Sequence, residues 1–164
     1  MTDTTNSYRI LFVCWGNICR SPAAECVFRS LVESEGLSDQ ITCDSAGTID
    51  QHAGNPPDLR MREAAAKRNV VVAGASRIAT AKDFETVDLL LTMDDFNLSE
   101  LRSLSPNPEL AKKIRPFCEY LTEHHQREVP DPYFGGGHGF DLVLDLLEDG
   151  CSNLLASIRK QLAV

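Results

Sequence analysis

The sequence predicts a single three-layer α/β domain, formed by residues 8–164, in which four parallel strands are flanked by helices. The chain has 164 residues with 43% hydrophobic content, which is enough for one well-packed core and too little for two ordinary domains. Short apolar runs alternate along it with segments of helical periodicity, and this alternation indicates a parallel sheet with right-handed crossovers and helices on both faces. A polar loop follows the first apolar run directly, where such sheets place their ligands.

The first strand is expected at residues 8–13, an apolar run that follows a polar segment rich in Thr and Ser. We expect that segment, residues 1–7, to be a flexible N-terminal tail. The next helix should start at Ser21 and Pro22, because proline is tolerated in the first helical turn, and should end before Gly36. Its apolar residues recur at steps of three and four: Ala24, Val27, Phe28, Leu31 and Val32.

The same rhythm continues through the middle of the chain. A loop containing Gly47, Gly54, Pro56 and Pro57 separates two of its elements. The expected elements are a short strand near residues 41–44, a helix over about 58–68, a buried strand at 87–93, a helix at 95–104 and a weak edge strand at 113–117.

The last helix has the clearest pattern. Asp141 lies near its start and Arg159 near its end, which matches the helix dipole, and Gly150 is expected on its exposed side. One face of this helix should be apolar, made of Phe140, Val143, Leu144, Leu147, Cys151, Leu154, Leu155, Ile158 and Leu162.

The charge balance excludes several classes of partner. The chain has 16 basic and 24 acidic residues, a formal charge of -8, which repels nucleic acid and anionic membrane surfaces. The N-terminus has no basic stretch followed by a long apolar one, and no apolar run elsewhere is long enough to span a membrane. We therefore expect a cytoplasmic protein with no nucleic-acid or membrane partner.

The six cysteines are expected to stay reduced. A chain of this size can fold on its core without disulfides, and four of the thiols are interpreted as small buried hydrophobes: Cys26, Cys43, Cys118 and Cys151. Metal sites need clustered Cys and His, whereas the sequence has no Cys-x-x-Cys and one adjacent His pair, His124 and His125. We expect no metal and no cofactor.

The loop after the first strand carries the chemistry. It runs from Cys14 into the N-terminus of a helix, where unpaired N–H groups and the positive end of the dipole form an anion site. Gly16 and Asn17 tolerate positive φ, so the loop could point its N–H groups at one anion. Arg20 can add two parallel hydrogen bonds to a phosphate, and a thiol at Cys14 is favoured as the thiolate in that field.

The segment CWGNICRS resembles the low-molecular-weight protein tyrosine phosphatase family, whose signature is Cys-x-x-x-x-x-Arg-Ser near the N-terminus. The resemblance covers roughly residues 8 to 160 and implies a flavodoxin-like domain. It includes further segments in family order: Asp44-Ser45-Ala46-Gly47-Thr48, Gly54-Asn55-Pro56-Pro57-Asp58 with Arg60, Met93-Asp94 with Asn97, and Asp131-Pro132-Tyr133 with Phe140.

The resemblance implies a two-step hydrolysis of phosphotyrosine or small aryl phosphates. Cys14 would form a phosphocysteine, Arg20 and the loop amides would bind phosphate, and Asp131 would act as general acid and then base. Pro130 and Pro132 restrict the backbone around Asp131, and three glycines after it leave the loop room to move. Without the resemblance, Asp131 could be a solvated turn residue.

Other residues receive roles from the resemblance alone. Ser21 would hydrogen-bond the sulfur, although by itself it could be only a helix cap, and Asn17 would hold the loop through its side chain. A disulfide between Cys14 and Cys19 would switch activity off reversibly, with a purely structural Cys19 as the alternative. The phosphate-binding and loop-supporting set is Trp15, Gly16, Asn17, Ile18, Cys19, Ser21 and Ser45.

The expected substrate slot departs from the family pattern. Its walls would be Trp15, Gln51, Tyr133 and Phe134, and rings on a slot suit a phenyl phosphate. Trp15 stands where Leu or Thr is more usual, and Gln51 where some relatives have an aromatic residue. Gly74 takes the place of a His that supports Asn17 in some members.

Three alternatives remain open. Arsenate reduction would need a downstream cysteine pair, but Cys118 and Cys151 are far apart in the sequence. Phosphoarginine hydrolases carry Thr at the position of Ile18, so the apolar side chain favours phosphotyrosine. The third is a catalytically silent phosphate-binding module or an interaction protein. The sequence does not choose between a monomer and a weakly self-associating dimer.

Overall fold

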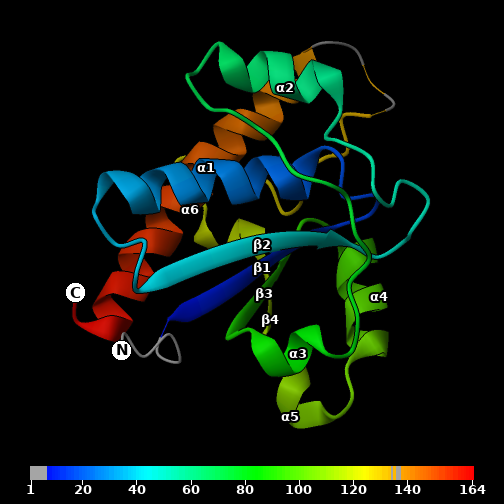
Figure 1. Ribbon diagram of the computed structural model, residues 1–164, viewed down its shortest axis with the longest axis vertical. Helices are drawn as coiled ribbons and strands as arrows, with labels where there is room; N and C mark the ends of the chain where they lie inside the picture. Colours follow the sequence, from blue (N-terminus) through cyan, green and yellow to red (C-terminus); the bar gives the residue numbers. More distant parts are fainter. Residues whose placement is uncertain (1–6, 134, 136–137) are drawn as a thin grey trace.

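The computed structural model describes residues 7–133, 135 and 138–164 (Figure 1). Four strands form one parallel sheet in the order β2-β1-β3-β4. The predicted tail at residues 1–7 falls almost wholly outside the described residues and stays a prediction. The elements are β1 Tyr8–Cys14, α1 Arg20–Ser34, β2 Ile41–Gly47, α2 Leu59–Ala66, α3 Asp83–Thr86, β3 Leu89–Thr92, α4 Asp95–Leu104, α5 Pro108–Ala111, β4 Ile114–Pro116, the 3-10 helix η2 Phe117–Tyr120 and α6 His138–Leu162.

Helices cover both faces of the sheet, with α1 and α6 on one side and α3, α4 and α5 on the other (Figure 1). The alternation of β1 explains the two cores, because successive side chains point to opposite faces. Ile10 and Phe12 pack into the core under α1 and α6, whereas Leu11 and Val13 pack into the second core. The three-layer α/β prediction is confirmed.

All four strands differ in length from the prediction, and β2 and β3 differ most. β2 continues to Gly47, because all seven of its residues pair in register with β1, from Tyr8 opposite Ile41 to Cys14 opposite Gly47. β3 is shorter than the apolar run that predicted it and ends at Thr92. The short elements α3, α5 and η2 were not expected, since a single turn of four residues is too short to show an apolar periodicity.

Gly150 corrects one expectation. It is buried and faces Phe117, where a Cβ atom would lie 2.3 Å from the ring. The apolar face of α6 is therefore wider than the sequence indicated, and it includes the buried Leu146. Glycine at this position lets η2 and α6 approach each other closely.

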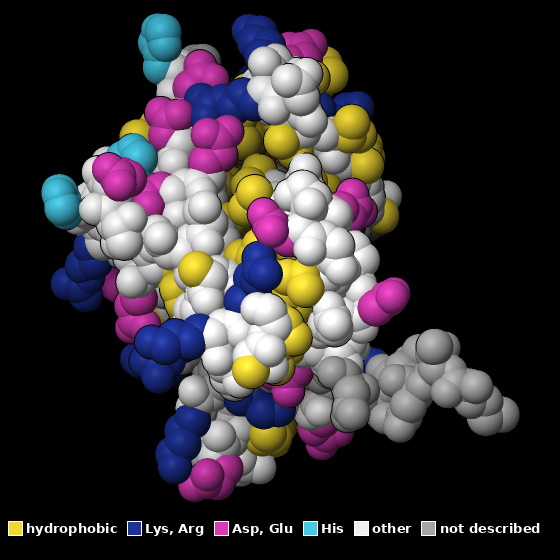
Figure 2. All heavy atoms as spheres, turned by 90° about the vertical axis from the view of Figure 1, so that its left-hand side faces the viewer, with side chains coloured by type: hydrophobic (Ala, Val, Ile, Leu, Met, Phe, Trp, Pro, Cys, Tyr) yellow, Lys and Arg dark blue, Asp and Glu magenta, His cyan; other side chains and the backbone are white. Residues whose placement is uncertain are grey.

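The surface mixes charges of both signs. Acidic and basic side chains are interspersed on the face shown in Figure 2. Ion pairs join separate elements, as between Arg68 and Asp145 at 2.8 Å and between Arg159 and Glu35 at 3.0 Å. Among the described residues, no helix has both the length and the apolarity needed to cross a membrane.

Asp149 of α6 holds the loop that follows η2. Its carboxylate accepts hydrogen bonds from the backbone N–H groups of Thr122, Glu123 and His124, and lies 2.9 Å from His124 Nδ1. Only 4% of the Asp149 side chain is exposed. Burial alone would raise the pKa of Asp149, but these hydrogen bonds lower it to about 2.

We expect Asp149→Asn to lower the free energy of unfolding by about 2 kcal/mol at neutral pH. The folded-state pKa lies below the ordinary value of 3.8, so this stabilisation is complete above about pH 4 and is lost as the pH falls through about 2. Urea unfolding at several pH values measures it. Asp145→Asn, on the same helix but half exposed, should have little effect. An equal loss from Asp149→Asn at pH 7 and pH 2 would contradict the electrostatic explanation.

Candidate active site

In the loop between β1 and α1, carbonyl groups accept hydrogen bonds from residues of other segments. No N–H group of residues 15–19 donates a hydrogen bond within the described part of the chain. These N–H groups are therefore available to an anion bound by the loop. The carbonyls of Cys14 and Trp15 accept from Thr48 N–H at 3.0 and 2.9 Å, that of Gly16 from the Ser76 hydroxyl at 3.0 Å, and that of Ile18 from Asp58 N–H at 2.8 Å.

Gly16 and Asn17 shape the loop in different ways. Asn17 has φ of 56°, the left-handed conformation that asparagine tolerates better than most residues. Gly16 does not have positive φ, contrary to the role expected for it. Its small size matters instead, because a Cβ atom there would lie 2.9 Å from Cδ2 of His52.

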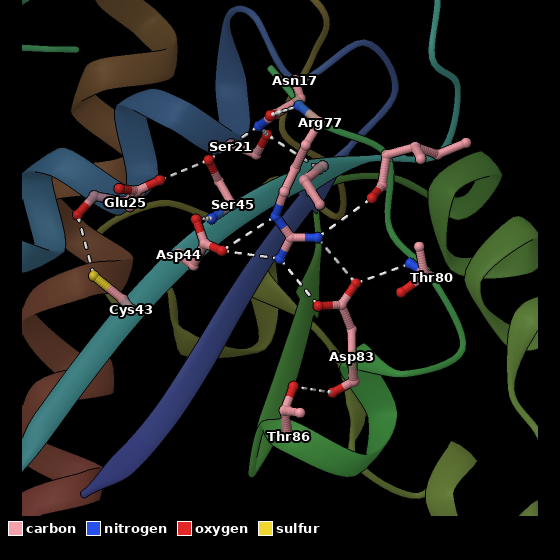
Figure 3. A network of polar contacts seen from close by, with 12 residues as sticks. Asn17, Ser21, Glu25, Cys43, Asp44, Ser45, Arg77, Thr80, Asp83 and Thr86 are labelled. Atoms are coloured by element: carbon pink, nitrogen blue, oxygen red, sulfur yellow. Dashed lines mark hydrogen bonds and ion pairs between the residues drawn. The ribbon is translucent and has the colours of Figure 1, made fainter. Parts of the chain in front are cut away.

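A chain of hydrogen-bonded polar side chains links Ser21, Asn17, Ser45 and Glu25 (Figure 3). Cys14 Sγ lies 2.9 Å from Ser21 Oγ, which accepts a hydrogen bond from Asn17 Nδ2 at 2.7 Å. Asn17 Nδ2 also donates to Ser45 Oγ at 3.0 Å, and the Ser45 hydroxyl donates to Glu25 at 2.7 Å. The structure thus brings Ser21, Asn17 and Ser45 together behind Cys14, as expected, and adds Glu25.

Arg77 supports the loop from a distant part of the chain. Its backbone N–H donates to Asn17 Oδ1 at 3.0 Å. Its guanidinium joins Asp44 of β2 to Asp83 of α3, at 2.9 and 3.0 Å (Figure 3). Both polar ends of the Asn17 side chain are thereby used, which leaves it one orientation.

Gly74 lies beside the same network. It lines a cavity of about 80 Å³ together with Asn17, Glu25 and Ser45, and it has φ of 123°. A glycine brings no side chain into this cavity. In this chain Asn17 therefore depends on the Arg77 backbone and the two serines.

Arg20 is the buried cation of the site. Only 2% of its side chain is exposed, and its Nη1 donates to Asp94 at 2.6 Å and to the Val129 carbonyl at 3.0 Å. Burial alone would lower the pKa of Arg20, but negative charge at Cys14, Asp94 and Asp131 raises it. The guanidinium therefore stays charged and held in one place.

Asp94 is a site residue whose role was missed. It follows β3 and starts α4, where its side chain accepts from Asn97 N–H in a capping box. Its other oxygen binds Arg20. Its position directly after a strand was the available signal, but only the fold brings it to Arg20.

Asp131 is the second carboxylate beside Arg20. Its carboxylate lies 3.5 Å from Nη2 of Arg20 and accepts a hydrogen bond from Tyr133 N–H at 3.0 Å. About 29% of the side chain is exposed, so solvent can reach it. Val129 anchors the segment, donating to the Met93 carbonyl at 2.8 Å.

The structure describes three of the four expected wall residues, Trp15, Gln51 and Tyr133. Tyr133 is exposed to 38% and its ring centroid lies 6.1 Å from that of His52. Since His52 also contacts Gly16, it lies between the loop and Tyr133, whereas its neighbour Gln51 is exposed. Trp15 is half-buried, and Phe134 lies outside the described residues.

All six cysteines are free thiols. Cys26 and Cys151 are buried, as predicted, and Cys43 and Cys118 are partly buried against the core. Burial and then the charge of Asp58 raise the pKa of Cys19, which keeps this second thiol of the loop protonated at neutral pH.

The parallel sheet flanked by helices, with a thiol at the end of its first strand and a buried arginine at the start of the next helix, defines a three-layer α/β protein. The profile of the family described as low molecular weight phosphotyrosine protein phosphatase matches residues 9–164. The chain belongs to this family and is a hydrolase of the protein tyrosine phosphatase class.

Individual relatives agree with this assignment. A putative low molecular weight protein-tyrosine-phosphatase of Synechocystis is 46% identical, over 94% of this chain and 98% of that protein. The human low molecular weight phosphotyrosine protein phosphatase is 39% identical, over 82% and 85%. The crystal structure of a protein tyrosine phosphatase from Entamoeba histolytica, with Hepes in its active site, superposes with a TM-score of 0.92 at 41% identity, over 94% and 99%.

Proposed function

We propose that the chain hydrolyses phosphotyrosine and small aryl phosphate monoesters through a phosphocysteine on Cys14. One observation supports this most strongly. Arg20 lies between two carboxylates, at 2.6 Å from Asp94 and 3.5 Å from Asp131, beside a loop whose N–H groups at residues 15–19 donate to no acceptor among the described residues. A phosphate dianion in that loop would meet a cation, a ring of donors, a nucleophile and an acid together.

In the first step the Cys14 thiolate attacks phosphorus and the bond from phosphorus to the phenolic oxygen breaks. Asp131 gives its proton to that oxygen, so the leaving group departs as a neutral phenol. Arg20 and the loop N–H groups bind the three equatorial oxygens, where negative charge is spread in the transition state.

In the second step Asp131, now ionised, takes a proton from water, whose oxygen attacks phosphorus. The bond from phosphorus to sulfur breaks, and the electron pair returns to Cys14 as thiolate. Ser21 Oγ lies 2.9 Å from this sulfur and donates a hydrogen bond to the returning charge. Asn17 favours that orientation by donating to the oxygen of Ser21.

Aromatic side chains at the mouth support aryl substrates. Trp15 belongs to the loop, His52 lies against Gly16, and Tyr133 lies next to His52. An apolar slot between aromatic rings suits a phenyl group. Ile18 presents a bulky apolar side chain and favours phosphotyrosine over phosphoarginine. Arsenate reduction has less support, because Cys118 and Cys151 lie on η2 and α6 and are separately buried or half-buried.

The direct test uses the purified wild-type protein. We expect turnover of p-nitrophenyl phosphate and of a phosphotyrosine peptide without added metal, slower turnover of a phosphoarginine peptide, and a phosphate adduct on Cys14 after acid quenching. Phosphate binding without turnover would favour a binding module. Equal or faster phosphoarginine hydrolysis would reject the argument from Ile18.

We further propose a cytoplasmic location and a redox brake at Cys19. Oxidation of Cys14 to a sulfenic acid would allow Cys19 to condense with it, forming the disulfide and releasing water. Since the pKa of Cys19 is raised, this condensation should be faster at alkaline pH. Cys19→Ser protein treated with peroxide should then recover less activity in dithiothreitol than wild type; equal recovery would show that Cys19 is only structural.

A further inference from the structure

Arg60, in the first turn of α2, lies between the two functional loops. Its guanidinium binds the carboxylate of Asp58 twice, with Nε 3.1 Å from Oδ1 and Nη2 2.9 Å from Oδ2. The same Nη2 donates to the backbone carbonyl of Tyr133 at 3.2 Å. Arg60 is partly exposed, yet it has three polar contacts that fix its plane.

Two aromatic rings complete its surroundings. The guanidinium carbon lies 5.4 Å from the ring centroid of Tyr133 and 4.8 Å from that of Phe140, at the start of α6. These are cation–π distances. A planar guanidinium can contact rings while it donates hydrogen bonds within its plane, which the ammonium group of lysine cannot reproduce.

Asp58 connects this group to the phosphate-binding loop. Its backbone N–H donates to the carbonyl of Ile18 at 2.8 Å, and its side chain accepts the N–H of Arg60 as the cap of α2. The hydrogen bond from the Arg60 side chain is the main cause that lowers the pKa of Asp58, so the pair stays ionised. Asp58 and Arg60 therefore form one unit attached to the loop.

The other end of the unit holds the segment of the general acid. Arg60 binds the carbonyl of Tyr133, and the N–H of Tyr133 donates to Asp131 Oδ1 at 3.0 Å. A continuous path thus leads from Ile18 through Asp58, Arg60 and Tyr133 to Asp131. We propose that Arg60 is a positioning residue that holds Asp131 over the phosphate-binding loop and so sets how well the leaving group is protonated. This inference rests on the proposed function of Asp131.

The test is the dependence of kcat/KM on the leaving group, because kcat/KM reports the step in which the phenol departs. With Arg60→Met we expect about a tenfold loss for phenyl phosphate, whose leaving group needs the proton. The loss should shrink with p-nitrophenyl phosphate, so the plot of log kcat/KM against leaving-group pKa becomes steeper. Inhibition by inorganic phosphate should not change, since the phosphate contacts of Arg20 and the loop remain.

Two controls separate positioning from general damage. Arg62→Met removes an arginine of the same helix whose side chain, within the described ranges, donates only to the Pro57 carbonyl, at 3.0 Å, and it should leave the slope unchanged. Arg60→Met in the Asp131→Asn background should cause no further loss, because the acid is already absent. Arg60→Lys keeps the positive charge but lacks the planar guanidinium. It should also steepen the plot of log kcat/KM against leaving-group pKa, but by less than Arg60→Met.

Three outcomes would overturn the proposal: an equal loss for every leaving group, a full loss in the Asp131→Asn background, or an unchanged slope in folded Arg60→Met and Arg60→Lys proteins. Unfolding curves establish that the variants are folded. Failure of the proposed function is distinguishable, because then the wild-type protein itself would not turn over p-nitrophenyl phosphate.

Discussion

Replacing Cys14 with serine should reduce turnover of p-nitrophenyl phosphate by about 10⁴-fold or more, because the serine hydroxyl remains protonated where the thiol can ionise. The change is small in volume, and the hydrogen bond to Ser21 at 2.9 Å can be kept by an oxygen atom. Steady-state rates with a quenched assay measure the loss. Phosphate binding, measured by calorimetry, should persist, since Arg20 and the loop N–H groups are unchanged.

Cys118→Ser is the matched control. Cys118 is half-buried against the core in η2, and burial raises its pKa to about 11, so it remains an un-ionised thiol at neutral pH. We expect near wild-type activity from this variant. Substantial activity in Cys14→Ser protein, checked by mass spectrometry for purity, would remove Cys14 as the nucleophile. Loss of phosphate binding together with activity would point to a collapsed loop, and Cys14→Ala would then be compared.

The part of the fold that could be predicted is the part with a local pattern. Three elements could be recognised from their own residues: the apolar run of β1, the amphipathic helix α1 and the periodic apolar face of α6. Gly150 shows the limit of such patterns, because its burial depends on the ring of Phe117 from another element. The sequence marks α6 as amphipathic without showing how wide its buried face is.

The candidate site divides in the same way. Cys14, Arg20 and Ser21 lie in one short segment, and the chemistry of a thiol at a helix N-terminus could be argued from that segment alone. His52 and Asp94 reach the loop only through the fold, one from the turn after β2 and the other from the end of β3. His52, the neighbour of the expected wall residue Gln51, lies against Gly16 and beside Tyr133. The sequence did not indicate this, because in an irregular turn the side-chain direction cannot be inferred from alternation.

The two carboxylates beside Arg20, those of Asp94 and Asp131, have different roles that their spacing in the sequence does not reveal. Asp94 is nearer to Arg20, at 2.6 Å, yet it also caps α4 and accepts the N–H of Asn97. Asp131 is farther, at 3.5 Å, and lies on an irregular segment with part of its side chain exposed. We infer that Asp94 orients the guanidinium whereas Asp131 is free to exchange a proton with the leaving group.

Asp131→Asn should therefore lower kcat/KM for phenyl phosphate by about 10²- to 10³-fold, with a much smaller loss for p-nitrophenyl phosphate. The amide has the same shape and can accept from Tyr133 N–H, but it has no acidic proton to give to the phenolic oxygen. A nitro group stabilises the departing phenolate and makes that proton less important. Rates across a series of substituted phenyl phosphates measure the difference as a steeper slope.

Two comparisons make this result specific to the acid. Asp95→Asn removes an exposed carboxylate that pairs with Arg127, and it should leave the slope unchanged. Asp94→Asn should lower kcat/KM by a similar factor for every leaving group, because it acts through Arg20 on phosphate binding and not through the leaving oxygen. The two roles would be exchanged if Asp131→Asn lowered kcat/KM equally for all substrates and Asp94→Asn steepened its dependence on leaving-group pKa. Asp94 would then be the acid.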